Sequence, residues 1–286
     1  MNKNYYRGRM SKRIELVDIA KCLGIFLMIF GHSGLQGYPH NWIYAFHMPF
    51  FFLTSGLFLK ADYGALGDVV KKNCRQLLVP YVFFYILTIP FGLVYIYFHG
   101  VPISTDYLWK PIVGMFYGVD HLTDTYSYFT NGPLWFLLAL FWARILFATN
   151  RVHKYSSVGI VIEAVISFIL YRMLDGHHIN IWSIAQAFML YPFLCVGYFL
   201  NRKWALVRRI EEANPSSILL ISTLALTVVS AAVPFLGIIE YGSLRMGNMP
   251  LMSFAIAIVG SVMMLTVSKL WSYLKCRQIL NMGGVR

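Results

Sequence analysis

Long runs without charged residues restrict this chain more than any other feature. From Cys22 to Leu59 the sequence has no Asp, Glu, Lys or Arg, and similar apolar runs recur as far as Ser268. A helix that crosses a bilayer needs about 20 mainly apolar residues. Only 13% of the 286 residues are charged, whereas about a quarter are charged in a typical soluble domain. We therefore expect an all-α protein that is surrounded mainly by lipid.

The apolar runs predict a polytopic transmembrane helical bundle of about eight spans. The residues "SGLQGYPHN" divide the first run into two helices, and six further runs lie at 76–105, 132–149, 158–171, 176–201, 213–239 and 246–268. No internal repeat and no domain linker is evident in the sequence. We therefore treat residues 1–286 as a single integral-membrane domain.

The distribution of cations orients the predicted bundle. With the N-terminus in the cytoplasm, 19 of the 24 Lys and Arg residues fall in inner segments, and only Lys110 and Arg245 fall in outer ones. An excess of cations in cytoplasmic loops is the known topology signal. The net charge of +12 therefore reflects topology, and nucleic acid is not expected as a partner. The four cysteines are too scattered for a metal site and are expected to be reduced.

The first span carries three residues that can take part in chemistry. Lys21 and His32 are 11 residues apart, which places them within about 20° on one helix face and about 16 Å apart along the axis. Asp18 lies within about 40° of the same face. Ionisable residues inside a membrane are functional candidates by default, and a neutral imidazole can accept a proton from a hydroxyl. The alternative is that Lys21 snorkels to the inner interface and His32 meets water between the headgroups.

The second predicted span, "YAFHMPFFFLTSG", adds further candidates. Pro49 cannot donate a backbone hydrogen bond, so we expect a kink that frees the carbonyl of Ala45, with His47 just on its N-terminal side. His47 is expected at a depth similar to that of His32. Ser55 and Gly56 would allow another helix or a ligand to approach closely. Ordinary packing is the alternative explanation of the kink.

Four motifs, taken in order, resemble the acyltransferase 3 family of polytopic membrane O-acyltransferases. They are "DIAKCLGIFLMIFGHS", "FHMPFFFLTSG", "KKNCRQLLVPY" and "GPLWFLLALF". The family pattern of Arg or Lys, ten residues and His matches Lys21 and His32, and the preceding acid matches Asp18. The family pair Arg-x-x-Arg is met as Lys72-x-x-Arg75. Where the family has an aromatic residue after Ser-Gly, this chain has Leu57.

The resemblance implies a fold and an activity. Family members have about ten spans, so two further helices would follow the "ILNMGG" stretch, and the closest branch is the fucose acetylase-like one. The implied reaction moves an acetyl group from cytoplasmic acetyl-CoA, a substrate rather than a bound cofactor, to a hydroxyl of a surface or exopolysaccharide sugar. The implied location is the cell (inner) membrane. Asp18, Lys21 and His32 would be catalytic.

Other residues could support such a reaction. Lys72 and Arg75, with Lys71, could bind the phosphates of the donor, although topology signalling explains them equally well. His47, Ser55 and Trp135 would support the acceptor side, where Trp135 could stack on a sugar or simply anchor the helix at the interface. The outer loop at 99–131, with Asp106, Asp120 and Asp124, could shape the acceptor site. Arg144 and Glu163 are expected to pair across a helical hairpin, because unpaired charges at this depth are costly.

The sequence therefore predicts a membrane-bound O-acetyltransferase. A protein of another class, a non-catalytic transporter or flippase of glycan intermediates, would also use buried charges. Such a protein does not need a lysine and a histidine on one helix face together with a cationic donor site. The expected partners are acetyl-CoA, a carbohydrate or lipid-linked glycan acceptor and membrane lipid.

Overall fold

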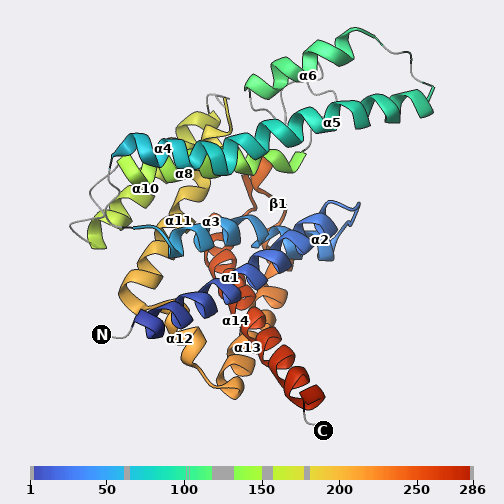
Figure 1. Ribbon diagram of the computed structural model, residues 1–286. Coiled ribbons are helices and arrows are strands. Elements are labelled where there is room, and N and C mark those ends of the chain that lie inside the picture. Colours follow the sequence, from blue (N-terminus) through green and yellow to red (C-terminus); the bar gives the residue numbers. More distant parts are fainter. Residues whose placement is uncertain are drawn as a thin grey trace. The chain divides into compact units, whose positions relative to one another are not determined.

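The chain is helical almost throughout and divides into two compact units (Figure 1). The computed structural model describes residues 3–60, 65–100, 102, 104–117, 132–149, 157–176 and 181–283. The first unit comprises Met1–Leu59, Val196–Glu240 and Arg245–Arg286, and the second comprises Lys60–Cys195 and Tyr241–Leu244.

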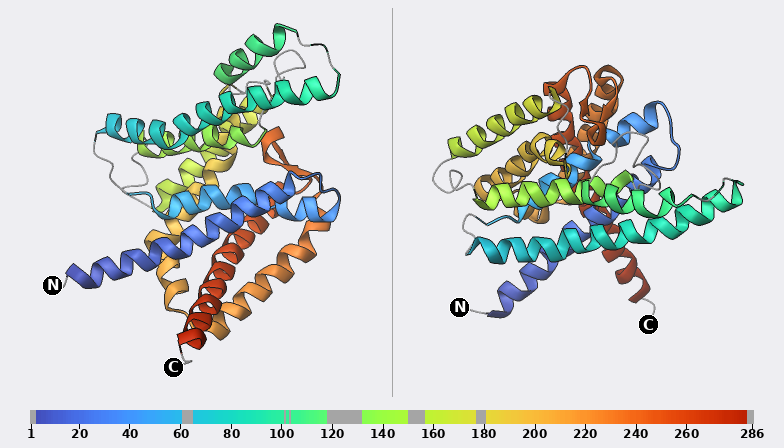
Figure 2. Two further views of the ribbon diagram at one scale, coloured as in Figure 1. Left: turned by 45° about the vertical axis from the view of Figure 1, so that its right-hand side comes forward. Right: turned by 90° about the horizontal axis from the view of Figure 1, so that it is seen from above.

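The first unit combines the N-terminal helices with the last two long helices. Its elements are α1 (Lys3–Gly31), α2 (Tyr38–Tyr44), α3 (His47–Leu57), the C-terminal part of α11 (Ile184–Trp204), α12 (Leu206–Glu212), α13 (Pro215–Leu236), β1 (Ile239–Glu240), β2 (Arg245–Met246) and α14 (Pro250–Gly283). Helices α13 and α14 lie side by side (Figure 2). The short antiparallel pair β1–β2 joins them, with Ile239 opposite Met246.

Local sequence signals set the ends of α13. The side chain of Asn214 accepts a hydrogen bond of 2.8 Å from the backbone N–H of Ser217, and Pro215 occupies the first helical position. An N-cap asparagine followed by proline is a strong start signal for a helix. Gly237 ends the helix with a φ of 73°, a left-handed conformation that glycine adopts without strain. The chain then turns directly into β1.

Helix α3 lies at the centre of the first unit, and glycines of three other helices pack against it. A Cβ atom on Gly197 of α11 would lie 2.0 Å from the backbone oxygen of Leu53. A Cβ atom on Gly260 of α14 would lie 2.5 Å from the side chain of Phe46, which immediately precedes α3. A Cβ atom on Gly24 of α1 would lie 2.9 Å from the ring of Phe50. Small residues at these crossings allow the helices to approach closely, as is usual for helices within a membrane.

The second unit is built around one long helix. Its elements are α4 (Leu66–Asn73), the π-helical turn η1 (Cys74–Leu78), α5 (Val79–Phe98), α6 (Asp106–Tyr117), η2 (Gly132–Leu134), α8 (Trp135–Thr149), α10 (Ser157–Gly176), the N-terminal part of α11 and η3 (Tyr241–Ser243). Helices α4, η1 and α5 continue into one another. Pro80 cannot donate to the carbonyl of Gln76, and the wider π turn lets the helix pass this point without breaking.

The structure confirms the prediction of an all-α polytopic protein. Within the residues described, six helices are long and apolar enough to cross a membrane: Leu66–Phe98, Gly132–Thr149, Ser157–Asp175, Ile184–Trp204, Pro215–Leu236 and Pro250–Leu274. They correspond to the third to eighth predicted spans. The third predicted span begins earlier than expected, because α4 joins it.

The second predicted span differs from expectation. It is not one kinked helix but two helices, α2 and α3, which are separated at Ala45 and Phe46. His47 therefore follows the break instead of preceding it. Pro49 falls in the first turn of α3, where a backbone N–H has no hydrogen-bond acceptor within the helix. The missing N–H of the proline therefore removes no helical hydrogen bond, and the proline helps to start the helix instead of bending it.

We predict that Gly197→Ala destabilises the protein strongly. The added methyl group would overlap the backbone of Leu53, and backbone cannot rotate away as a side chain can. We expect a loss of more than about 3 kcal/mol in the free energy of unfolding, above the usual range for overpacking. The apparent melting temperature in detergent measures it. Gly67→Ala is the matched control, because no atom lies within 4 Å of its added Cβ. Equal melting temperatures for the two variants would contradict the close packing of α3.

Candidate functional site

Helix α1 carries two of the three predicted catalytic residues, and the third follows it directly. Asp18 and Lys21 lie on α1, and His32 is the first residue after the helix ends at Gly31. Asp18 and His32 are exposed, and Lys21 is half-buried at the edge of the packed face that contains Val17, Ala20 and Gly24. The helix is continuous between Lys21 and Gly31, so the predicted alignment along one face holds up to its last turn.

A cluster of three histidines surrounds Tyr44 in the first unit. The Tyr44 hydroxyl lies 3.1 Å from Nδ1 of His32, and the two rings meet edge to face. His40 stacks on Tyr44 with ring centroids 3.9 Å apart, and His47 meets the same ring at 4.8 Å. His32 and His47 were predicted to lie at similar depth, and both contact this one tyrosine. We call these four residues the histidine cluster.

The members of the histidine cluster differ in exposure. Tyr44 and His47 are buried, and Nδ1 of His47 lies 2.9 Å from the backbone carbonyl of Ile43. His32 is exposed, and His40 is half-buried. A neutral imidazole is the form that can accept a proton from a hydroxyl.

Helix α2 is held in place by its contacts with α13 and α1. The Tyr38 hydroxyl donates to the backbone carbonyl of Ser230 at 2.9 Å, and Nε1 of Trp42 donates to the Ser230 hydroxyl at 3.2 Å. Gly31 allows α2 to approach the end of α1, because a Cβ atom there would lie 3.2 Å from Ile43 and 3.3 Å from the Tyr44 ring. These contacts fix the position of Tyr44 relative to His32.

Sequence reasoning did not identify Tyr44 and His40. A signal was available in their spacing, because His40, Tyr44 and His47 are four and three residues apart, which brings side chains together in a helix. Ser55, predicted to support the acceptor, is buried within α3. A close approach of another helix to α3 is described at Leu53, which faces Gly197.

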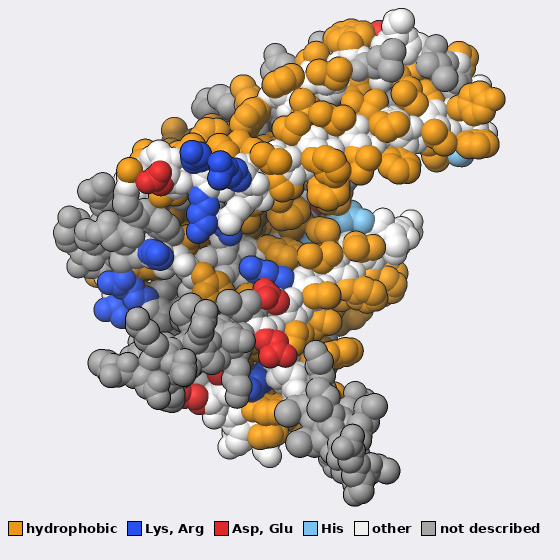
Figure 3. All heavy atoms as spheres, in the orientation of Figure 1, with side chains coloured by type: hydrophobic (Ala, Val, Ile, Leu, Met, Phe, Trp, Pro, Cys, Tyr) orange, Lys and Arg blue, Asp and Glu red, His pale blue; other side chains and the backbone are white. Residues whose placement is uncertain are grey.

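The predicted donor-binding cations lie in the second unit. Lys71 and Lys72 lie in the last turn of α4, and Arg75 lies in the π turn. All three side chains are exposed. Figure 3 shows Lys and Arg side chains gathered over α4, at one end of a helix whose remainder is covered by hydrophobic side chains. Arg144 of α8 reaches the same segment and donates to Oδ1 of Asn73 at 3.3 Å and to Oε1 of Gln76 at 3.4 Å.

Arg144 and Glu163, which were predicted to pair, each have described hydrogen-bond partners. Glu163 is buried in α10, and its Oε2 accepts a hydrogen bond of 2.8 Å from the hydroxyl of Tyr191. Arg144 binds the amide oxygens of Asn73 and Gln76. The hydrogen bonds and ion pairs described for these helices do not include the predicted contact between Arg144 and Glu163. The turn predicted between them, residues 150–156, lies outside the described residues.

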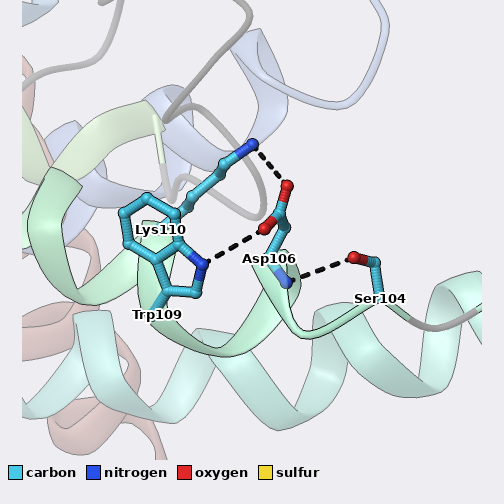
Figure 4. Close-up of polar contacts among 4 residues, drawn as sticks. All are labelled: Ser104, Asp106, Trp109 and Lys110. Carbon is cyan, nitrogen blue, oxygen red and sulfur yellow. Dashed lines mark hydrogen bonds and ion pairs between the residues drawn. The ribbon is translucent and has the colours of Figure 1, made fainter.

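The loop that was predicted to be outer contains helix α6, whose first turn is held together by polar contacts (Figure 4). Asp106 accepts from Nε1 of Trp109 at 3.1 Å and pairs with Nζ of Lys110 at 2.6 Å, while its backbone N–H donates to the Ser104 hydroxyl at 3.3 Å. The hydrogen bond from Lys110 lowers the pKa of Asp106. Asp106 is thus engaged within its own helix. The other acids predicted for this loop, at positions 120 and 124, lie outside the described residues.

Trp135 is buried, with only 6% of its surface exposed. It begins α8, directly after the 3-10 turn η2. An interfacial anchor would expose its ring to the headgroups, and stacking on a sugar would need an open ring face. The burial of Trp135 therefore favours a role in packing.

The fold defines a class of protein: a multi-pass membrane protein built of apolar helices, with ionisable side chains gathered at helix ends. The model of the acyltransferase 3 family (Acyl_transf_3, acyltransferase domain) matches residues 14–284 of the chain. The chain therefore belongs to the acyltransferase 3 family, whose reaction requires an acyl donor and a hydroxyl-bearing acceptor. No curated protein and no solved structure matches the chain.

We predict that Trp135→Ala lowers stability instead of weakening acceptor binding. Truncating a buried tryptophan costs about 3–5 kcal/mol because a cavity remains. The apparent melting temperature in detergent measures this loss. Trp271→Ala is the control, because 57% of that side chain is exposed, and we expect it to change the melting temperature little. An unchanged melting temperature for Trp135→Ala together with a raised KM for the acceptor would instead support stacking on a sugar.

Proposed function

We propose that this protein is an O-acetyltransferase that moves an acetyl group from cytoplasmic acetyl-CoA to a hydroxyl of a surface or exopolysaccharide sugar. The observation that carries the proposal is the placement of His32. Its exposed imidazole lies at the end of the helix that also carries Lys21, in a chain that belongs to an acyltransferase family. The proposed location is the cell membrane.

His32 acts as the general base in the proposed reaction. Its imidazole takes the proton of the acceptor hydroxyl as the hydroxyl oxygen attacks the carbonyl carbon of acetyl-CoA. The bond from that carbon to sulfur breaks, a C–O ester bond forms, and CoA leaves as a thiolate that receives the proton. The products are the acetylated sugar and free CoA. Such a base typically contributes about 10²–10⁴-fold to the rate.

Lys21 and Asp18 assist at the other end of the same helix face. Lys21 is half-buried, and in the proposed reaction its ammonium group binds the donor. Asp18, one turn earlier, balances this charge. His47 and Ser55 support the site from inside the fold, because both are buried within α3.

Lys72 and Arg75 bind the phosphates of acetyl-CoA in this proposal. Both side chains are exposed, and charge-assisted hydrogen bonds to phosphate are roughly twice as strong as neutral ones. They lie beside a π turn, a local feature that is often found at functional sites. Arg144 approaches this turn from α8 through Asn73 and Gln76.

We predict that His32→Ala lowers the turnover of acetyl transfer by about 10²–10⁴-fold, because the general base is lost. Purified protein, acetyl-CoA and an extracted surface glycan, with free CoA and one acetyl increment on the glycan as readouts, provide the assay. His99→Ala is the matched control: His99 is also exposed and also directly follows a long helix, and the proposed reaction assigns it no role. Near-normal transfer by His32→Gln would show that His32 is only an interfacial residue.

We predict that Lys72→Gln and Arg75→Gln each raise the KM for acetyl-CoA by about tenfold, because each removes a charge-assisted contact to phosphate. Lys203→Gln, which removes an exposed cation at the end of α11, serves as the control and should leave this KM unchanged. Unchanged donor affinity accompanied by poor or inverted insertion would show that Lys72 and Arg75 act only in topology.

A further inference from the structure

We propose that Tyr44 is the positioning residue of His32: its hydroxyl oxygen accepts the Nδ1 proton of the imidazole and thereby keeps Nε2 free to act as the base. This inference rests on the role proposed above for His32. It adds a residue that the sequence motifs do not contain and states which nitrogen of His32 carries out the chemistry.

Tyr44 and His32 are close enough to share a hydrogen bond. The Tyr44 hydroxyl lies 3.1 Å from Nδ1 of His32, which is hydrogen-bond distance. Tyr44 is buried while His32 is exposed. Nδ1 is thus the nitrogen engaged by the buried tyrosine, and in this proposal Nε2 is the nitrogen that meets the hydroxyl-bearing acceptor.

The ring of Tyr44 is held in place by its neighbours. His40 stacks on the tyrosine ring at 3.9 Å, and the ring of His47 meets it at 4.8 Å. On the side of α1, Gly31 lets the ring approach so closely that a Cβ atom would lie 3.3 Å away. The ring is thus held on three sides, and its hydroxyl stays at a fixed place beside His32. A fixed second partner is what orients a histidine for chemistry.

The direction of the hydrogen bond with Tyr44 decides the tautomer of His32. A neutral imidazole carries one proton, and the hydrogen bond made by one nitrogen decides which nitrogen carries it. A tyrosine hydroxyl can accept or donate. If Tyr44 donated to Nδ1, the proton would be on Nε2, and His32 could not act as a base toward an acceptor on its exposed side. Acceptance by Tyr44 is the arrangement that agrees with catalysis at Nε2.

The surroundings contain other groups that can titrate. His40 lies on α2, the helix that carries Tyr44, and His47 lies on α3. Glu240 lies on β1, where it is paired in register with Arg245 of β2. A pH profile alone would therefore mix several groups. A residue-specific chemical measurement on His32 avoids this problem.

The test measures the reactivity of His32 toward diethyl pyrocarbonate, which acylates an imidazole nitrogen that carries no proton. Modification is followed in the purified protein by mass spectrometry of the peptide that contains His32. Tyr44→Phe keeps the aromatic ring and its contacts but removes the hydroxyl. Without the acceptor, the proton is no longer held on Nδ1 and spends more of its time on Nε2, so the rate of acylation at Nε2 should fall. Tyr273→Phe, which removes the hydroxyl of a tyrosine on α14 that donates to the backbone carbonyl of Ala213 at 2.7 Å, should leave the rate unchanged.

Activity provides the second readout. Tyr44→Phe should lower kcat by roughly 10- to 100-fold, as loss of an orienting partner typically does, with the KM for acetyl-CoA unchanged. Tyr273→Phe should keep both constants. If Tyr44→Phe does not fold, the ¹⁵N chemical shifts of His32 in the wild-type protein decide the question, with the signal assigned by its loss in His32→Gln.

The outcomes separate this inference from the proposed function. A rate of modification that rises or stays constant in Tyr44→Phe, or a proton found on Nε2 in the wild type, would overturn the role of Tyr44 even if acetyl transfer is observed. Absence of transfer by the wild-type protein would instead refute the proposed function. The reactivity and chemical-shift measurements need no substrate, so they still decide whether Tyr44 fixes the tautomer of His32.

Discussion

The close contact of α3 with glycines of other helices is the constraint on which the first unit depends. Gly197 brings α11 against the backbone of Leu53, and Gly260 brings α14 against Phe46. Lipid is as apolar as a leucine side chain, so helices inside a membrane gain little from hydrophobic contact alone and rely on dense packing. The first unit achieves that density at α3, and the positions of α1, α11 and α14 follow from it.

The histidine cluster is a consequence of this packing. Phe46 fits against Gly260 at the point where the chain separates into α2 and α3, and the ring of Tyr44 lies among His32, His40 and His47. Tyr38 and Trp42 then fasten α2 to α13 through Ser230. A break in one helix thus turns a set of separate aromatic residues into an arrangement that can orient a base.

The second unit shows how polar groups are accommodated in an apolar helix. Pro80 removes a backbone donor, and the π turn before it lets the helix continue. The same turn carries Arg75 and lies beside Arg144, whose guanidinium reaches Asn73 and Gln76. In α10, the carboxylate of Glu163 accepts a hydrogen bond from Tyr191. Arg144 and Glu163, whose polar groups would be costly in lipid, are thus each provided with a protein partner.

The sequence by itself determined the class of the protein, most of its long helices and the family, because long apolar runs and helical spacing are local properties of the chain. The predicted alignment of Lys21 with His32 followed from the period of the helix. In the structure the helix that carries Lys21 is unbroken up to Gly31, the residue before His32. The break between α2 and α3, the partners of Arg144 and Glu163 and the burial of Trp135 could not be read in this way. They depend on which helices pack together, and only the tertiary structure decides that. Tyr44 illustrates the difference: its spacing from His40 and His47 is local, but its contact with His32 joins two helices and exists only in the folded chain.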